Sequence, residues 1–236
     1  MPPTCVTACL ARDEASNWLP QLLPIWKSYG SVLVLDDGST DGTPTLAASH
    51  GALVSHRGAE GPSWGSESPA RAQLWQEAVG TGATWVFVED ADMLPLRDPT
   101  PLFLEGLDAV AFPLYDIWDL PTLSYREDQF WQGHLNHRVW AVRNPSVWFQ
   151  PVWPDRGIHC GHIPTNIPLK RVLNAPHEFA ILHLGYATPE ARERKFKQYE
   201  SQRHQLTERE WEHAKSILDP SPNLKPLPWE PQWPIK

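Results

Sequence analysis

The sequence predicts a mixed α/β fold in which a mainly parallel sheet carries flanking helices. Strand-like apolar runs alternate with helix-like segments at a spacing of about 20 to 30 residues, as in right-handed βαβ units. Residues 31–35 and 85–88 are rich in branched or aromatic side chains, as expected of buried strands. Both runs lead directly into acidic residues, which indicates chemistry at the ends of these strands.

The N-terminal elements alternate between strand and helix. Residues 4–10 form a short apolar run, and Ser16 is placed to cap a helix over residues 17–29 that Gly30 ends. Of the two prolines in this helix, one fits the first turn and the other is expected to kink it. Further strands are expected at residues 31–35, 52–55, 85–88, 108–113 and 139–142, and further helices at residues 41–50, 70–79, 190–199 and 208–217.

The composition indicates a folded protein. Of the 236 residues, 41% are apolar and 20% are charged, which is not typical of a disordered chain. No apolar run approaches the ~20 residues that span a bilayer, and the N-terminus lacks the features of a signal peptide. The three cysteines are expected to be reduced and mostly buried. We therefore expect a soluble, cytoplasmic protein without a membrane span.

Acidic residues follow two of the predicted strands. Asp36 and Asp37 follow residues 31–35, and Asp90 and Asp92 follow residues 85–88. In a parallel sheet both clusters fall on the edge where ligands bind. Carboxylates there can accept hydrogen bonds from a base or ribose, and an Asp-x-Asp pair can hold Mg²⁺ or Mn²⁺ against a diphosphate. An EF-hand loop starting at Asp37 is excluded, because its closing glutamate would fall on an alanine.

Four pieces of the sequence together resemble the family 2 glycosyltransferases of the GT-A fold. Ala11-Arg-Asp-Glu14 is similar to the family's turn after the first strand, and Asp36-Asp-Gly-Ser-Thr-Asp-Gly-Thr43 is close to its most specific signature. Ala70-Arg71-Ala72 resembles a helix start of the family, and residues 85–92 resemble its strand with Asp-x-Asp. The resemblance covers about residues 4–113, and it is carried by the order and spacing of the pieces.

The resemblance implies a role for each matching residue. Arg12, Glu14 and the Asp36–Asp37 pair would bind the base and ribose of a nucleotide, and Arg71 would lie near the base or phosphates, unless it forms a surface ion pair. Asp90 would contact the ribose or metal-bound water, and Asp92 would ligate Mn²⁺ or Mg²⁺. His183, within an apolar run, would be a further metal or diphosphate ligand, with a packed core histidine as the alternative.

Inverting sugar transfer needs a carboxylate that takes the proton of the acceptor hydroxyl. The family usually places this base beyond the Asp-x-Asp motif. Asp128, in Arg126-Glu-Asp-Gln-Phe-Trp131, is the first choice, and Asp116 and Asp119 are close rivals.

The resemblance therefore implies a metal-dependent glycosyltransferase with a nucleotide-sugar donor, most commonly a UDP-sugar. Residues 1–113 would form the nucleotide-sugar-binding half and residues 114–218 the acceptor-side, catalytic half of one domain. Residues 219–236 would be a Pro-rich tail. A sugar-nucleotide nucleotidyltransferase is one alternative, disfavoured because residues 11–14 contain no glycine. A non-catalytic sugar- or nucleotide-binding module is another, disfavoured because both acidic clusters and His183 are present.

The acceptor stays open between a saccharide and a hydroxylated DNA base of the kind modified in phages. Tryptophans that could stack on it, or simply pack in the core, are at positions 118, 131, 140, 148 and 153. For DNA, the phosphate contacts would come from Arg192, Arg194, Lys195 and Lys197. The net charge of −8 disfavours a broad DNA-binding surface.

Two further patterns are judged coincidental. Gly61-Pro-Ser-Trp-Gly65 fits the nucleophile pattern of hydrolases, but it lies in a predicted loop rather than between a strand and a helix. His159-Cys-Gly-His162 offers only three candidate zinc ligands at a spacing that fits no common site. His159 or His162 is instead expected to line the acceptor cleft.

Overall fold

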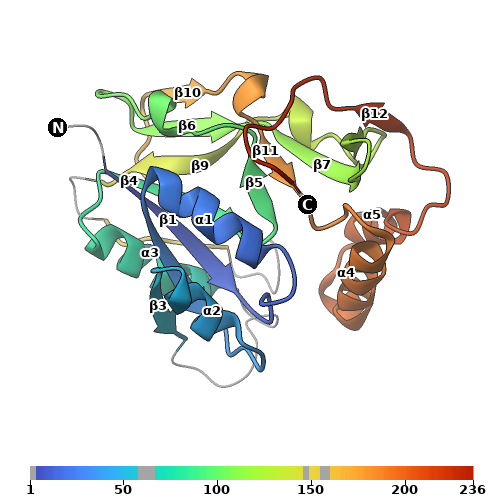
Figure 1. Cartoon of the computed structure of the whole chain (residues 1–236), viewed down its shortest axis with the longest axis horizontal. Helices are drawn as coiled ribbons and strands as arrows, with labels where there is room; N and C mark the ends of the chain where they lie inside the picture. Colours follow the sequence, from blue (N-terminus) through green and yellow to red (C-terminus); the bar gives the residue numbers. More distant parts are fainter. Residues whose placement is uncertain (1–3, 58–66, 146–148, 155–159, 236) are drawn as a thin grey trace.

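The computed structural model describes residues 4–57, 67–145, 149–154 and 160–235, and these contain a seven-stranded and a five-stranded β-sheet (Figure 1). The large sheet has the order β10-β6-β9-β4-β1-β2-β3. Its strands are β1 (Cys5–Ala11), β2 (Ser31–Asp36), β3 (Leu53–His56), β4 (Trp85–Asp90), β6 (Ala109–Phe112), β9 (Arg138–Arg143) and β10 (Val172–Asn174). Strands β1 to β4 are parallel, and β9 is antiparallel to both of its neighbours. The predicted α/β fold with a mainly parallel sheet is confirmed.

Helices cover both faces of the large sheet, because its central strands carry apolar side chains on both sides. On one face α1 (Leu19–Tyr29) and α2 (Thr43–Ser49) pack in a core cluster that includes Cys9, Val34 and Phe87. On the other face α3 (Ser68–Gly80) packs in a cluster that includes Val6 and Val86. Cys5, Cys9 and Cys160 are buried and free of disulfides, as predicted.

The small sheet has the order β12-β8-β7-β11-β5. Its strands are β5 (Met93–Pro95), β7 (Leu114–Asp119), β8 (Ser124–Arg126), β11 (Ile181–His183) and β12 (Leu224–Pro226). Next to it, α4 (Pro189–Ser201) and α5 (Glu208–Ser216) lie side by side (Figure 1). Tyr199 and Ala214 of these helices share a third core cluster with Trp118 and Trp131. Short 3₁₀ turns lie at Thr100–Leu102, Gly133–Leu135, His177–Phe179 and Arg203–Gln205.

The extended C-terminal segment packs back onto the molecule. β12 pairs with β8, and the indole of Trp229 stacks on the ring of His177 with centroids 5.9 Å apart. Trp229 and Trp233 are partly buried against the main core cluster. None of the helices in the described ranges is long and apolar enough to cross a membrane.

The elements predicted before residue 113 are present, with ends within two residues of those expected. The first helix begins at Leu19, and Trp18, which makes no side-chain cap, precedes it in place of the predicted Ser16. Pro20 lies in its first turn and Pro24 inside it. The small sheet was not predicted, because most of its strands are three residues long and show no measurable periodicity.

Candidate active site

The acidic ends of β2 and β4 lie on one edge of the large sheet, as predicted. β1 runs between them, with Ala11 opposite Asp36 and Leu10 opposite Asp90. After Asp90 the chain turns through Ala91 and Asp92 and enters β5 of the small sheet. Asp92 therefore lies where the two sheets meet.

Three side chains form a continuous chain of polar contacts at this junction. Asp92 Oδ2 lies 3.4 Å from His183 Nε2, and His183 Nδ1 lies 2.8 Å from Asp116 Oδ1. The small sheet aligns them, because β11 pairs with both β5 and β7 and places His183 opposite Met93 and Asp116. Burial alone would lower the pKa of His183, but Asp92 and Asp116 outweigh it and raise the pKa to about 9. The imidazolium thus donates a hydrogen bond from Nδ1 to Asp116 and forms an ion pair through Nε2 with Asp92.

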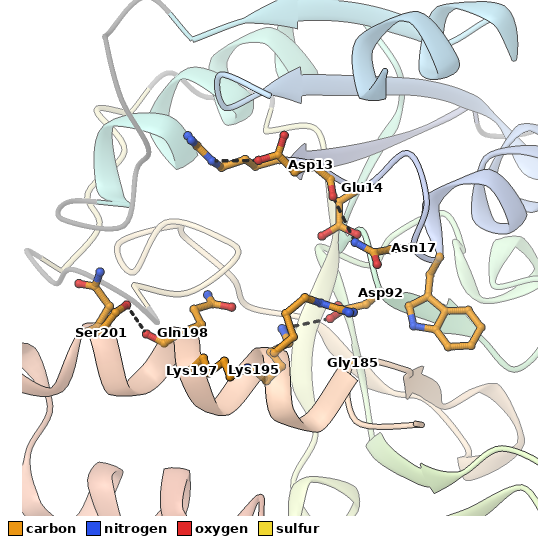
Figure 2. Close-up of a pocket in the computed structure, with 13 residues that line it drawn as sticks. Asp13, Glu14, Asn17, Asp92, Gly185, Lys195, Lys197, Gln198 and Ser201 are labelled. Carbon is orange, nitrogen blue, oxygen red and sulfur yellow. Dashed lines mark hydrogen bonds and ion pairs between the residues drawn. The ribbon is translucent and has the colours of Figure 1, made fainter. Parts of the chain in front are cut away.

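Lys195 of α4 brings a second cation to Asp92. Its Nζ lies 3.1 Å from Asp92 Oδ2, as the dashed line in Figure 2 marks. Burial would raise the pKa of Asp92, but Lys195 and His183 hold it well below its usual range. Asp92 also keeps the pKa of Lys195 above its usual range in spite of burial. Asp92 is therefore ionised and largely buried between two cations.

Gly185 lies against this group and leaves no room for a side chain. A Cβ at this position would lie 2.9 Å from His183 Nε2 and 2.9 Å from Lys195 Cε, and closer still to Asp92 Oδ2. The backbone here is fixed by a 2.8 Å hydrogen bond from Leu184 N to Asp92 O. Close approach of the backbone requires glycine at this position.

Asp90 belongs to a separate network. Its Oδ1 lies 2.9 Å from Arg71 Nη2, and its Oδ2 lies 2.9 Å from His162 Nε2. Glu67 also pairs with Arg71, at 2.6 Å. Burial would raise the pKa of Asp90, but His162 and Arg71 lower it well below its usual range. The Arg71 side chain is 7% exposed, so its ion pairs are buried rather than on the surface.

The Asp36–Thr43 signature supports the neighbouring loop after β1. Arg12 donates to the carbonyl of Asp37 at 2.8 Å, and Asp13, which has a φ of 52°, accepts from the Thr40 N–H at 2.7 Å. Asp41 accepts from Ala15 N, at 3.1 Å. These contacts hold residues 12–15 in a shape that an isolated chain would not keep.

Asp36 and Asp37 themselves are engaged elsewhere. Asp36 Oδ2 lies 3.2 Å from His56 Nδ1, and Asp37 forms an ion pair with Arg57, just after β3. Both aspartates are buried. They fix the ends of β2 and β3 and are absent from the pocket lining described next, whereas Arg12 and Glu14 are part of it.

Two pockets meet at the Asp92–His183–Asp116 chain. The first, called the Glu14 pocket, has a volume of about 500 Å³ and lies between the loop after β1 and helix α4 (Figure 2). It is lined by Arg12, Asp13, Glu14, Asn17, Trp18, Asp92, Gly185, Arg194, Lys195, Lys197, Gln198, Ser201 and Gln202. Burial, followed by the charge of Asp92, raises the pKa of Glu14 to about 7.

The second, called the Trp131 pocket, has a volume of about 380 Å³. It is lined by Asp90, Met93, Leu114, Asp116, Gln129, Phe130, Trp131, Gly133, Arg138, Trp140, His162, His183, Tyr186, Lys195, Tyr199, Arg209, Glu210 and His213. Aromatic rings thus make up much of its wall. Asp92 borders the first pocket, Asp116 and His183 border the second, and Lys195 borders both.

The three candidate bases differ in their surroundings. Asp116 lines the Trp131 pocket and accepts from His183. Asp128 binds Arg126 Nε at 2.6 Å and the N–H of Phe130 at 2.9 Å, and it does not line this pocket. Asp119 accepts from the N–H and hydroxyl of Thr122 in a turn outside the pocket. Of these three aspartates, Asp116 alone borders the Trp131 pocket.

The residues present fit a divalent cation only in part. Within the described ranges, no three His, Cys, Asp or Glu side chains converge as metal ligands. The Asp92 Oδ2 to His183 Nε2 separation of 3.4 Å is close to that of two ligands at ~2.1 Å from one ion. Asp116 orients His183 as carboxylates behind metal-binding imidazoles do. Asp90 does not fit, because Arg71 and His162 occupy both of its oxygens.

Sequence reasoning missed the part that Lys195 and Gly185 play. Gly185 two residues after His183 was the available signal, because a glycine beside a candidate ligand often marks close backbone approach. Lys195 and Arg192 were considered only as DNA contacts, and Arg192 instead donates to the carbonyls of Trp118 and Tyr186. The structure gives no support to DNA as a partner.

The remaining motifs fall into two groups. Trp118, Trp131, Trp140 and Trp153 are all buried, and Trp131 and Trp140 also line the second pocket. His162 lines that pocket as well. Trp148, His159 and the run from Gly61 to Gly65 lie outside the described residues.

No protein-family model and no curated protein matches the chain. Among solved structures it is similar to S. aureus TarS in complex with UDP, with 17% identity, a TM-score of 0.38 and coverage of 48% of this chain and 36% of that one. It is also similar to Mycobacterium tuberculosis glucosyl-3-phosphoglycerate synthase in complex with Mn²⁺, UDP and glucosyl-3-phosphoglycerate. Here the identity is 22%, the TM-score is 0.34, and the coverage is 48% of this chain and 44% of that one.

For mannosyl-3-phosphoglycerate synthase from Rubrobacter xylanophilus, the identity is 21%, the TM-score is 0.37, and the coverage is 49% of this chain and 41% of that one. The chain thus spans less than half the length of these three structures. Because the likeness is partial, the function of this chain is inferred from its own residues.

Proposed function

We propose that the chain transfers a sugar from a nucleoside-diphosphate donor to an acceptor hydroxyl. The observation that carries this proposal is the Asp92–His183–Asp116 chain, which joins two pockets at the carboxyl edge of parallel strands. Group transfer requires two substrates to meet at one atom, and two pockets that share a charged junction meet this requirement. The resemblance to family 2 glycosyltransferases points to the same chemistry.

The donor would occupy the Glu14 pocket. Arg12, Lys195 and Lys197 provide positive charge for a diphosphate. Glu14 and Asn17 provide hydrogen-bonding groups for the ribose or base. In this proposal Asp36 and Asp37 act indirectly, because they fix the strand ends and the loop that carries Arg12. The family resemblance makes a UDP-sugar the first donor to test.

The acceptor would occupy the Trp131 pocket, whose aromatic wall suits the apolar face of a saccharide ring. The acceptor oxygen attacks the anomeric carbon and passes its proton to Asp116. The bond from that carbon to the phosphate oxygen breaks, and its electron pair stays on the departing diphosphate. Attack from the face opposite the leaving group gives inversion. Asp128 and Asp119 are not part of this step, because neither lines the pocket.

Charge on the leaving group is neutralised at the junction. His183 and Lys195 are both cationic and lie next to Asp92, on the side where the diphosphate would leave. A divalent cation would be held by Asp92 and a neutral His183, so it would take the place of the imidazolium proton and supply Lewis-acid stabilisation there. Asp90, held by Arg71 and His162, would position the wall of the acceptor pocket.

Calorimetric titration of nucleoside diphosphates, with and without Mn²⁺, tests this function on wild type and Asp92→Asn. The first combination to titrate is UDP with Mn²⁺. One nucleoside diphosphate should bind the wild type, and Mn²⁺ should strengthen this binding only when Asp92 is present. With the sugar conjugate of that nucleotide and no acceptor present, slow hydrolysis should release the nucleoside diphosphate, because water takes the place of the acceptor hydroxyl. If no nucleoside diphosphate binds under either condition, the proposed function is wrong.

Release of pyrophosphate from a nucleoside triphosphate and a sugar phosphate would instead identify a nucleotidyltransferase.

A further inference from the structure

Lys195 has a position that no other residue in the described ranges shares. It lines both the Glu14 pocket and the Trp131 pocket, and its ammonium lies 3.1 Å from Asp92. Its side chain is 27% exposed, whereas that of Asp92 is 14% exposed. The ammonium group thus lies between a buried carboxylate and the open volume of the Glu14 pocket (Figure 2).

The two cations at Asp92 are held to different degrees. His183 is fixed on its other side by Asp116, at 2.8 Å, and it lies on a strand between two neighbours. Lys195, in the described ranges, has an ion pair with Asp92 alone. A lysine also carries its charge on a flexible four-carbon stem, so it can reach a different anion without movement of the backbone. Lys195 is therefore the cation that can leave Asp92.

The Glu14 pocket offers an alternative anion site for this ammonium. Arg12, Arg194 and Lys197 line the same pocket, so a diphosphate that enters it meets several cations. A diphosphate carries more negative charge than one carboxylate and presents several oxygens. It would therefore compete with Asp92 for Lys195.

We propose that Lys195 is an exchangeable counter-ion that neutralises Asp92 in the empty site and moves to the donor's diphosphate on binding. The move removes one of the two cations that compete with a divalent cation for Asp92, so Lys195 makes cation binding dependent on the donor. This inference rests on the proposed function for the identity of the donor. The exchange itself, in which Lys195 leaves Asp92 for a diphosphate, involves no covalent step and does not depend on sugar transfer.

Exchange has a signature that simple misfolding cannot produce. Loss of the ammonium should weaken the binding of a diphosphate, because one charge-assisted contact is removed. The same loss should strengthen Mn²⁺ binding to the empty site, because one of the two cations that compete for Asp92 is removed. One substitution therefore acts in opposite directions on two ligands. Asp92 retains His183 as a partner in such a variant, so the junction is not left as an isolated buried charge.

The test uses inorganic pyrophosphate in the presence of EDTA and, separately, Mn²⁺ without nucleotide. Calorimetry measures the first and paramagnetic resonance of free Mn²⁺ the second. In Lys195→Met, we expect about 10-fold weaker pyrophosphate binding and several-fold tighter Mn²⁺ binding. Lys195→Arg should keep pyrophosphate affinity within about 3-fold of wild type. Lys215→Met is the control, since Lys215 pairs with exposed Glu212 and lines neither pocket.

A variant of the partner residue provides an independent readout if Lys195→Met does not fold. In Asp92→Asn, Lys195 is released, so pyrophosphate should bind as tightly as in wild type or more tightly, while Mn²⁺ binding is lost. Equal pyrophosphate affinity in wild type and Lys195→Met would overturn the inference, as would weaker binding in Asp92→Asn or no binding to wild type. If pyrophosphate behaves as expected but no nucleoside diphosphate binds, the exchange stands and the proposed function fails.

Discussion

His183 and Asp116 are joined by a 2.8 Å hydrogen bond between Nδ1 and Oδ1, across the parallel pairing of β11 with β7. The bond fixes the imidazole ring so that its other nitrogen faces Asp92. It also places the Asp116 carboxylate at the wall of the Trp131 pocket. One contact thus sets the orientation of two groups with different roles in the proposed transfer.

The first prediction concerns the identity of the base. Asp116→Asn should lower the rate of sugar transfer by about 100-fold or more, since an amide cannot take the acceptor's proton. Affinity for the nucleoside diphosphate should change by less than about 3-fold, because Asp116 does not line the Glu14 pocket. Steady-state kinetics together with calorimetry separate the two effects.

Asp119→Asn and Asp128→Asn are the matched comparisons for this prediction. Asp119 serves a turn and should be nearly neutral in transfer. Asp128 pairs with buried Arg126, so its variant should lose stability more than rate at a temperature where it is folded. A larger loss of rate in folded Asp128→Asn than in Asp116→Asn would identify Asp128 as the base.

The second prediction concerns the absence of a side chain at Gly185. Gly185→Ala should displace Asp92, His183 or Lys195, because the added Cβ would lie 2.9 Å or less from all three. We expect about 100-fold lower activity and a loss of about 1–3 kcal/mol in the free energy of unfolding. Gly80→Ala is the control, since a Cβ there meets nothing within 4 Å and should be neutral or slightly stabilising. Wild-type activity in Gly185→Ala would show that the junction tolerates expansion.

The third prediction concerns the signature segment as a support for the loop after β1. Asp41→Ala removes acceptors for Ala15 N and Thr43 N. The loop should loosen, and affinity for the nucleoside diphosphate should fall about 3- to 10-fold. Ser49→Ala, which removes an exposed hydrogen bond at the end of α2, is the control. Unchanged affinity in Asp41→Ala would mean that the loop keeps its shape without this carboxylate.

The fourth prediction concerns Glu89, a fully buried carboxyl group next to Asp90 in sequence. Neither of its oxygens has a hydrogen-bond partner among the described residues. Burial, followed by the charges of Asp90 and Asp92, raises its pKa well above the usual range. The folded state thus holds a proton that the unfolded state releases above about pH 4.3, so stability should fall as pH rises from there towards the folded-state pKa.

Glu89→Gln removes this titration while keeping the size of the side chain. Urea unfolding between pH 5 and 9 should show a smaller loss of stability with pH than in wild type, whose slope from one proton is on the order of 1.4 kcal/mol per pH unit. The variant should be the more stable of the two at the alkaline end. Glu105→Gln, at an exposed position, should follow wild type. Parallel curves for wild type and Glu89→Gln would show that Glu89 is ionised in the folded protein.

The N-terminal half of the fold could be predicted from the sequence because its strands are apolar runs of four to seven residues bounded by clear turns. The position of Asp36 and Asp90 on one edge followed from the parallel arrangement alone. The small sheet could not be predicted, because strands such as Met93–Pro95 and Ile181–His183 are defined by their partners and not by local pattern.

Only part of the candidate site could be predicted from the sequence. Asp92 and His183, which were predicted to bind one metal ion, lie 3.4 Å apart, and Glu14 and Arg12, which were predicted to bind the nucleotide, line a pocket. Their roles stay predictions. The partners of Asp36, Asp37 and Asp90 were beyond sequence reasoning. Asp36 pairs with His56 and Asp37 with Arg57, each 20 residues further along the chain, and Asp90 pairs with His162, 72 residues further. No local sequence pattern predicts these pairs.

The turn between β4 and β5 has a consequence for insertions and deletions. Only Ala91 and Asp92 separate the last residue of one sheet from the first residue of the other. Met93, next in the chain, is paired with His183, so the length of this turn fixes the distance between Asp92 and His183. A single added or lost residue here would shift the register of two sheets at once. Length variation should therefore be tolerated elsewhere in this chain, in its longer surface connections, before it is tolerated at this turn.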